Sequence, residues 1–344
     1  MHPFKYLALT PDILRLVGEI DEFKGAWKGL GSLTPDRRAT LRRIATLESA
    51  GSSTRMDGGR LTDSEVESLL SGSQPGSFKS QDEEAVAGYV EATRLVFDSW
   101  RDLSLTEDHI RQIHATLLKF SQRDEHRRGN YKNVSNCVEA FDERGWSVGV
   151  IFETATPADT PGLMKELVAW TNQELEGTEN HPLMVIAVFI IRYLAIHPFQ
   201  DANGRLARVL TNLLLLRSGY SYIPCMSLER VVEEHRGEYY RVIKSAQDES
   251  QLMDWIRFFL SCLVQQKNKL NEKVKRERTM TALSAIDEKL LQFARHHGRL
   301  TLTSAQKVTK ANRNTLKLHL RLLVQAGYLQ LLGRGRSSFY ETTS

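Results

Sequence analysis

Twelve consecutive residues decide the fold of this chain: His197-Pro198-Phe199-Gln200-Asp201-Ala202-Asn203-Gly204-Arg205-Leu206-Ala207-Arg208. Before them, residues 182–196 (PLMVIAVFIIRYLAI) are apolar on all but one position, which predicts a helix buried in the centre of a domain. Because a proline disfavours helical geometry in the residue before it, we expect this helix to end at His197. The polar turn 201–204 then precedes a second helix, which we expect to open at Arg205.

The residue types in this stretch predict a site for the transfer of a phosphate group. A neutral imidazole at His197 can take a proton from a hydroxyl, and the carboxylate of Asp201 can hold Mg²⁺. Free backbone N–H groups at a helix start attract phosphate, and Arg205 and Arg208 lie three residues apart on one helix face. The ligand with matching chemistry is a polyphosphate. The alternative, an ordinary histidine at a helix end beside solvated arginines, leaves the adjacent turn unexplained.

The stretch resembles the signature of the Fic (Fido) family, His-x-Phe-x-Asp/Glu-Gly/Ala-Asn-Gly/Lys-Arg, with a second Arg three residues on, and it matches every position. The resemblance implies a mainly α-helical Fic-type bundle with a small β-hairpin flap. It also implies an enzyme that transfers AMP from ATP to a Ser, Thr or Tyr hydroxyl of a target protein or of itself. The resemblance further implies that His197 is the general base and Asp201 the Mg²⁺ ligand. It implies that Asn203 and Gly204 form the anion-binding turn, and that Arg205 and Arg208 bind the outer phosphates of ATP.

Several positions refine this expectation. Family members that phosphorylate resemble the pattern with Lys at the place of Gly204, so Gly204 favours transfer of AMP. Ala202, in the nucleotide-binding turn, indicates that the backbone there keeps a negative φ. We expect His197 to titrate near neutrality, as suits a base. Tyr239 and Tyr240 resemble a tyrosine pair near the adenine pocket of related proteins, although packing alone would also explain them.

Upstream, the run Ser53-Thr54-Arg55-Met56-Asp57-Gly58-Gly59 resembles the Ser/Thr-x-x-x-Glu-Gly/Asn inhibitory motif of many Fic proteins. Ser53, Asp57 and Gly58 take its defined positions, with Asp where Glu is usual. The resemblance implies autoinhibition through an ion pair between Asp57 and Arg208 that competes with the γ-phosphate of ATP. An acid in the last helical turn also needs a compensating cation, because it faces the negative end of the helix dipole. A helix cap with Gly58 as its turn is the alternative.

Composition is typical of a cytoplasmic protein of two or three domains. The chain has 344 residues, of which 41% are hydrophobic and 26% are charged, and its net charge is +4. Its three cysteines are isolated and lack metal-ligand spacing, which argues for reduced thiols. The N-terminus lacks the pattern of a signal peptide, and no segment is long and apolar enough to predict a membrane span. We expect no membrane partner, and a homodimer stays open.

The patterns divide the chain into four regions. We expect an N-terminal helical region over 1–75, a Fic catalytic core over 76–265, a charged helical connector over 266–280 and a separate domain over 281–344. Within the core, alternating short runs after residue 128 stand where the family has its flap, a hairpin that holds the target peptide as an added strand.

The last region concentrates positive charge, with ten Lys and Arg against three Asp and Glu in residues 281–344. Three helical patterns followed by two strands predict a winged helix-turn-helix, a module that commonly presents its third helix to DNA. Packing against a partner is the alternative use. The candidate DNA contacts are Arg313, Lys317 and Arg321 on the third helix and Arg334 and Arg336 at the wing tip. The alternative function is therefore a DNA-binding regulator that uses the Fic fold as a nucleotide sensor, although a sensor needs no base at His197.

Overall fold

A computed structural model describes residues 10–29, 35–72, 78–281, 285–325, 327–333 and 338–343. These residues are mainly helical, and they include two separate two-stranded antiparallel hairpins, so the predicted mainly α fold with a small hairpin is confirmed. The chain divides into two compact units, Met1–Leu270 and Asn271–Ser344. The division falls inside the long helix α11 (Leu252–Thr281), which runs through the predicted helical connector. The four-region division itself stays a prediction.

Two apolar helices form the centre of the first unit. α7 (Pro182–Ile196) and α8 (Asn203–Arg217) are buried along nearly their whole length and pack against each other. α7 ends at Ile196, as Pro198 predicts, but His197 adopts a left-handed conformation with φ of 50° rather than the extended one usual before proline. α8 begins at Asn203, two residues earlier than predicted. The residues between these helices therefore form a short loop held between two buried elements.

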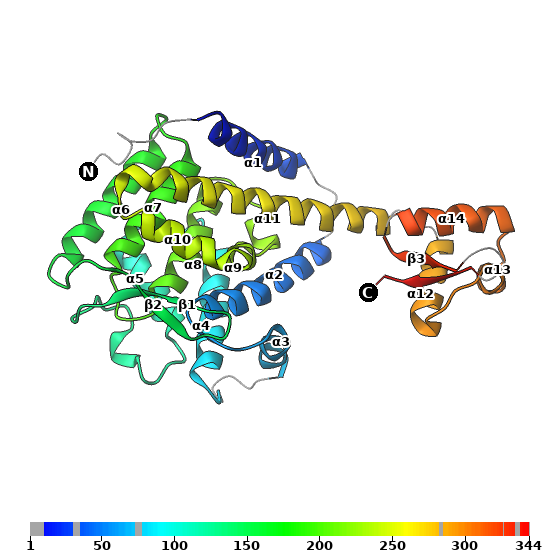
Figure 1. The fold of residues 1–344 in the computed structure, drawn as a ribbon, viewed down its shortest axis with the longest axis horizontal. Helices are drawn as coiled ribbons and strands as arrows, with labels where there is room; N and C mark the ends of the chain where they lie inside the picture. The colour runs from blue at the N-terminus through cyan, green and yellow to red at the C-terminus, as the bar shows by residue number, and fades with distance from the viewer. Residues whose placement is uncertain are drawn as a thin grey trace. The chain divides into compact units, whose positions relative to one another are not determined.

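The remaining helices of this unit surround the central pair. They are α1 (Pro11–Gly29), α2 (Pro35–Met56), α3 (Asp63–Gly72), α4 (Gln81–Ser99), α5 (Glu107–Leu117), α6 (Thr160–Glu176), α9 (Leu228–Glu234) and α10 (Arg236–Ser245), with short 3₁₀ helices at Glu125–Arg127, Ile223–Cys225 and Glu249–Gln251. α2 lies beside α9 and also contacts α4 and α8 (Figure 1). This packing brings the C-terminal end of α2 to the start of α8. Among the helices in the described ranges, none combines the length and apolar character that crossing a bilayer requires.

The hairpin of the first unit stands where the flap is predicted. Its strands β1 (Cys137–Phe141) and β2 (Ser147–Glu153) pair antiparallel, with two irregularities in their register. The turn between them spans residues 142–146. Trp146 at the end of this turn and Val148 and Val150 on β2 are apolar residues with exposed side chains.

The second unit has three helices followed by a hairpin. Its elements are α12 (Ala285–His297), α13 (Leu302–Thr309), α14 (Arg313–Gln325), β3 (Leu329–Leu332) and β4 (Phe339–Thr342). Buried leucines of α12, α14 and β3, together with Ala305 of α13, make its core, and Leu300 bridges to Tyr340 of β4. The order of elements matches the expected one, while the winged-helix assignment stays a prediction. Arg334 and Arg336, predicted at the wing tip, lie outside the described residues.

Candidate active site

The loop between α7 and α8 forms one wall of a cavity of about 300 Å³. The end of α2, strand β1 and helix α10 supply the other walls. Of the residues predicted for the site, those that line this cavity are Asp57, His197, Asp201, Ala202, Asn203, Gly204, Arg208, Tyr239 and Tyr240. Arg205 lines a neighbouring cavity of about 200 Å³ instead, which shares Asp57 and Asp201 with the first.

His197 lies half-buried at the exit of α7, and its Nδ1 is buried without a hydrogen-bond partner among the described residues. Burial, and to a smaller degree the nearby charge of Lys132, lower the pKa of His197 to about 3, although the carboxylate of Asp201 acts in the opposite direction. The prediction that this histidine titrates near neutrality is therefore wrong. The imidazole is neutral at pH 7, so it can accept a proton.

The short loop after His197 is closed by Asn203. The amide of Asn203 accepts a hydrogen bond from the backbone N–H of Phe199 at 2.9 Å and donates one to its carbonyl at 2.7 Å. The expectation of a negative φ at Ala202 is wrong, because its φ is 62°. A left-handed residue with a small side chain lets the chain turn from this closed loop directly into α8, at a cost of about 1–2 kcal/mol.

His114 of α5 supports the same loop. Its ring stacks on Phe199 with centroids 3.8 Å apart. The backbone N–H of Gly129 donates to Nδ1 at 3.0 Å, so Nε2 carries the proton and donates to the carbonyl of Asp201 at 3.2 Å. Burial lowers the pKa of His114 to about 4, which keeps the ring neutral.

Asp201 presents a half-exposed carboxylate at the cavity. Burial would raise the pKa of this group, but Arg205 and the backbone N–H of Ala202 together hold it below its usual value. The described residues contain no cluster of three or more metal-ligating side chains. One ionised carboxylate nevertheless fits Mg²⁺, which keeps several waters and takes substrate phosphate oxygens as further ligands.

Asp57, just after the end of α2, makes the ion pair expected with Arg208. The two side chains meet at 2.8 Å, and Arg208 also donates to Ser53, to Oγ at 2.7 Å and to the carbonyl at 2.8 Å. Burial would lower the pKa of the Arg208 guanidinium, but the Asp57 carboxylate together with Tyr239 and Tyr89 raises it. Gly204 permits the approach, because a Cβ there would lie 2.7 Å from Asp57 Oδ1. Gly58 follows with φ of 93°, so the helix-cap interpretation fits the same residues.

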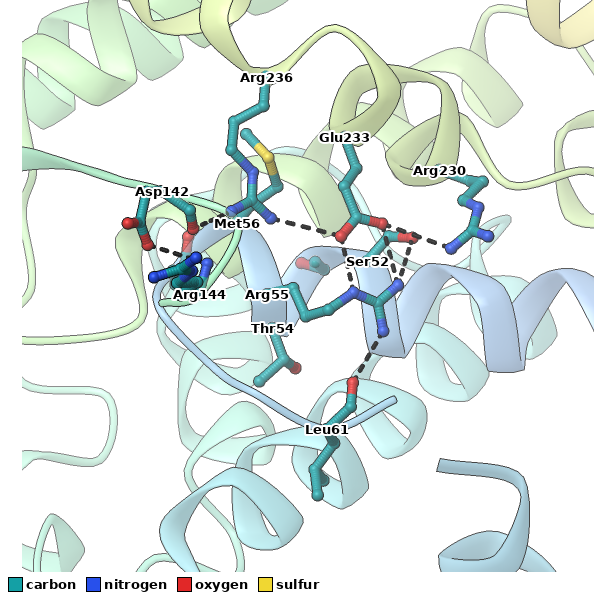
Figure 2. A network of polar contacts seen from close by, with 12 residues as sticks. Ser52, Thr54, Arg55, Met56, Leu61, Asp142, Arg144, Arg230, Glu233 and Arg236 are labelled. Atoms are coloured by element: carbon teal, nitrogen blue, oxygen red, sulfur yellow. Dashed lines mark hydrogen bonds and ion pairs between the residues drawn. The ribbon is translucent and has the colours of Figure 1, made fainter. Parts of the chain in front are cut away.

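A network of charged side chains fixes the end of α2 (Figure 2). Arg55 binds both carboxylate oxygens of Glu233 on α9, at 2.6 and 2.9 Å, and donates to the carbonyl of Leu61 at 2.9 Å. Arg236 reaches the same Glu233 at 3.3 Å and the carbonyl of Asp142 in the hairpin turn. Glu233 therefore connects the helix that carries Asp57 with the hairpin.

The tyrosine pair is held mainly by packing. Tyr239 is buried against Trp255 and Phe258, and the hydroxyl of Tyr240 donates to the carbonyl of Met56 at 2.6 Å. Both rings still line the cavity. The sequence interpretation missed two further residues at this site, Lys132 and Asn136, whose bonds surround His197 and are treated below.

Comparisons with known proteins agree with this geometry. Residues 104–215 match the Fic/DOC family model. Proteins called protein adenylyltransferase Fic from Drosophila sechellia and Drosophila melanogaster are 34% identical over 106 residues, which are 31% of this chain and 20% of each relative. The chain thus matches about a fifth of the length of these curated relatives.

Solved structures give a similar result. A Fic family protein from Desulfovibrio desulfuricans is 23% identical, with a TM-score of 0.63 over 98% of both chains, which shows a shared fold. A Fic-domain signalling protein from Bacteroides thetaiotaomicron is 25% identical, with a TM-score of 0.60 over 75% of this chain and 98% of that one.

Proposed function

This chain is a Fic-family protein, and we propose that it is an adenylyltransferase that transfers AMP from ATP to a Ser, Thr or Tyr hydroxyl of a target protein or of itself. The observation that carries the proposal is the single cavity lined by His197, Asp201, Gly204 and Arg208. These residues supply a base, a carboxylate, a helix start and a cation around one space. The name of the curated relatives supports the same reaction.

In the proposed reaction His197 takes the proton of the incoming hydroxyl. The hydroxyl oxygen forms a bond to the α-phosphorus of ATP, the bond from that phosphorus to the bridging oxygen breaks, and pyrophosphate leaves. Because the pKa of His197 is low, proton transfer becomes favourable only as the new bond forms and the hydroxyl grows more acidic. Most of the rate enhancement then comes from positioning and charge neutralisation.

The start of α8 would hold the phosphates. Asn203 and Gly204 line the cavity at the N-terminus of this helix, where backbone N–H groups and the helix dipole favour anions. Arg205 and Arg208 are assigned to the outer phosphates, and Asp201 to Mg²⁺, which when bound neutralises phosphate charge. Tyr239 and Tyr240 are assigned to the base end of the nucleotide.

Asp57 is proposed to restrain the enzyme. Its carboxylate is 2.8 Å from the guanidinium that the γ-phosphate needs, so ATP must displace it from Arg208. A charge-assisted pair contributes about 1.5–3 kcal/mol, which corresponds to roughly tenfold to a hundredfold suppression.

Labelling with α-³²P-ATP and Mg²⁺ tests the proposal, with label measured on the protein itself and on lysate proteins. We expect Asp57→Ala to incorporate more AMP than the parent, and Asp57→Ala combined with His197→Ala to incorporate none. Asp98→Ala is the matched control, because Asp98 makes an exposed ion pair with Arg42 away from the cavity. A folded Asp57→Ala protein that labels nothing would refute the transferase.

A second candidate function, DNA binding, rests on the exposed face of α14. Arg313, Lys317 and Arg321 recur at four-residue spacing and are exposed, so they form one basic row. The full chain should then retard DNA fragments at low salt, and retardation should weaken steeply as salt rises. No shift at low salt would remove this candidate. The cytoplasmic location and the homodimer stay predictions.

A further inference from the structure

Lys132 binds the backbone on both sides of His197. Its ammonium donates to the carbonyl of Ile196 at 2.9 Å, and its backbone N–H donates to the carbonyl of Pro198 at 2.8 Å. The preceding residue, Tyr131, bridges to Phe199. The segment that carries Lys132 therefore runs along the loop and brackets His197.

The same ammonium also joins the two ends of the hairpin. It donates to Asn136 Oδ1 at 2.8 Å, just before β1, and to Thr154 Oγ1 at 2.9 Å, just after β2. Asn136 in turn donates to the carbonyl of Phe199 at 2.8 Å. One side chain thus fixes three segments relative to one another: the end of α7 and both roots of the hairpin that lines the cavity.

Lys132 is only 4% exposed, and none of the bonds given for its ammonium goes to a carboxylate. A buried charge satisfied only by neutral oxygens is costly, and burial lowers the pKa of Lys132 to about 8. Neutral side chains could make hydrogen bonds at lower cost. The placement of a cation here indicates that its charge and its reach both matter.

His197 needs external support for its backbone. Its φ of 50° is left-handed, a conformation that costs a residue with a side chain about 1–2 kcal/mol and persists only where the surroundings hold it. We propose that Lys132 is a positioning residue for the transfer reaction: by binding the carbonyls on either side of His197, it holds the imidazole at the cavity wall and ties it to the hairpin. The inference rests on the proposed function, in which His197 is the base.

The charge of Lys132 has a second effect. Two charged groups act on the imidazole: Lys132 disfavours its protonated form, and Asp201 favours it. Removing the ammonium therefore moves the pKa of His197 upward, whereas Arg at this position preserves the sign of the effect.

Three full-length variants in an Asp57→Ala background test the role. Lys132→Met removes the charge and the three hydrogen bonds of the ammonium, keeps the backbone bond to Pro198, and retains an apolar stem of similar length. Lys132→Arg keeps the charge. Gln266→Met is the matched control, because Gln266 is fully buried in α11 and donates to the carbonyl of Met226 at 2.6 Å. It removes a buried side-chain hydrogen bond away from the cavity.

We expect Lys132→Met to lower the single-turnover rate of self-labelling about tenfold or more, while affinity for a non-hydrolysable ATP analogue stays within about twofold. Lys132→Arg should restore part of the rate, and Gln266→Met should leave it unchanged. If Lys132→Met labels at the reference rate, or if its affinity for the analogue falls in step with its rate, Lys132 does not position the base.

Histidine ¹⁵N NMR gives a readout that is independent of catalysis. The His197 resonance is identified by its absence in His197→Gln, and its titration is followed in each variant. Lys132→Met should raise the pKa of His197, with Lys132→Arg and Gln266→Met close to the reference; unchanged titration in Lys132→Met would overturn the inference. If the reference itself transfers no AMP, the proposed function fails, and this titration still decides whether Lys132 controls the state of His197.

Discussion

The loop that carries His197 and the end of α2 with Asp57, here called the inhibitory segment (residues 53–58), are held by different kinds of contact. The loop is fixed by buried neutral groups, with Asn203 bonded twice to Phe199 and His114 stacked on the same ring. The inhibitory segment is held by ion pairs that are partly exposed: the side chain of Asp57, which pairs with Arg208, is 30% exposed. Because salt weakens partly exposed ion pairs more than buried hydrogen bonds, the loop with the base should stay fixed while the contact of Asp57 with Arg208 can be released.

The largest effect should come from the loop. Asn203→Ala removes both bonds to Phe199. It leaves the N–H of Phe199 buried without this partner, while the carbonyl keeps its bond from Asn136, so the free energy of unfolding should fall by about 1–3 kcal/mol. Transfer should fall about a hundredfold, because the loop no longer aligns His197. Denaturant unfolding and AMP incorporation measure the two. Asn172→Ala, which loses one bond to the carbonyl of Leu105, should transfer AMP at the parental rate. If Asn203→Ala also transfers AMP at the parental rate, the bonds of Asn203 do not hold the loop for catalysis.

The next largest effect should come from the inhibitory segment. Asp57→Ala should raise affinity for a non-hydrolysable ATP analogue roughly tenfold to a hundredfold, because Arg208 no longer has to leave a carboxylate. Calorimetric titration measures it, with Asp98→Ala as control. Parental affinity in Asp57→Ala would mean that Asp57 only caps α2.

The lowered pKa of His197 also predicts how the free energy of unfolding depends on pH. The pKa of His197 is about 3 in the folded chain against an ordinary 6.5, so between these values the unfolded chain binds a proton that the folded chain does not. Stability is therefore lost as pH falls below about 6.5, by about 2 kcal/mol at pH 5. The parent should lose about that much more than His197→Gln between pH 7 and pH 5 in denaturant titrations. Equal losses would show that this imidazole is not buried.

The smallest effect should come from the ion pairs of Arg55, which hold the end of α2. Arg55→Met removes the pairs with Glu233 and Asp63, which loosens the end of α2 and should raise transfer about threefold. Arg94→Met, which breaks an exposed pair with Glu91, should change nothing. A rise as large as that in Asp57→Ala would show that the network supplies the whole restraint.

Local patterns in the sequence predicted the parts of this site that local chemistry controls. The apolar run of residues 182–196 and Pro198 predicted a buried helix and its end, and both are confirmed. The pair between Asp57 and Arg208 was expected only through a family resemblance, because the two residues are far apart in the chain.

The features that the sequence did not reveal depend on distant segments. The left-handed φ of Ala202 follows from the closure of the loop by Asn203, and the low pKa of His197 follows from burial. Lys132 gave no signal, because its three acceptors come from separate parts of the chain and one is a backbone carbonyl. Such contacts exist only once the helices have packed.

The hairpin turn rests on the residue next to Asp57. A Cβ at Gly145 would lie 2.4 Å from the carbonyl oxygen of Gly58, and Arg60 stacks on Trp146 with 4.4 Å between the guanidinium carbon and the ring centroid. Any molecule that lifts this turn must therefore also disturb the acid that faces Arg208. Thermodynamic linkage makes the effect mutual. A ligand that binds the hairpin and frees Arg208 would raise the affinity for ATP, and ATP would raise the affinity for that ligand by the same factor.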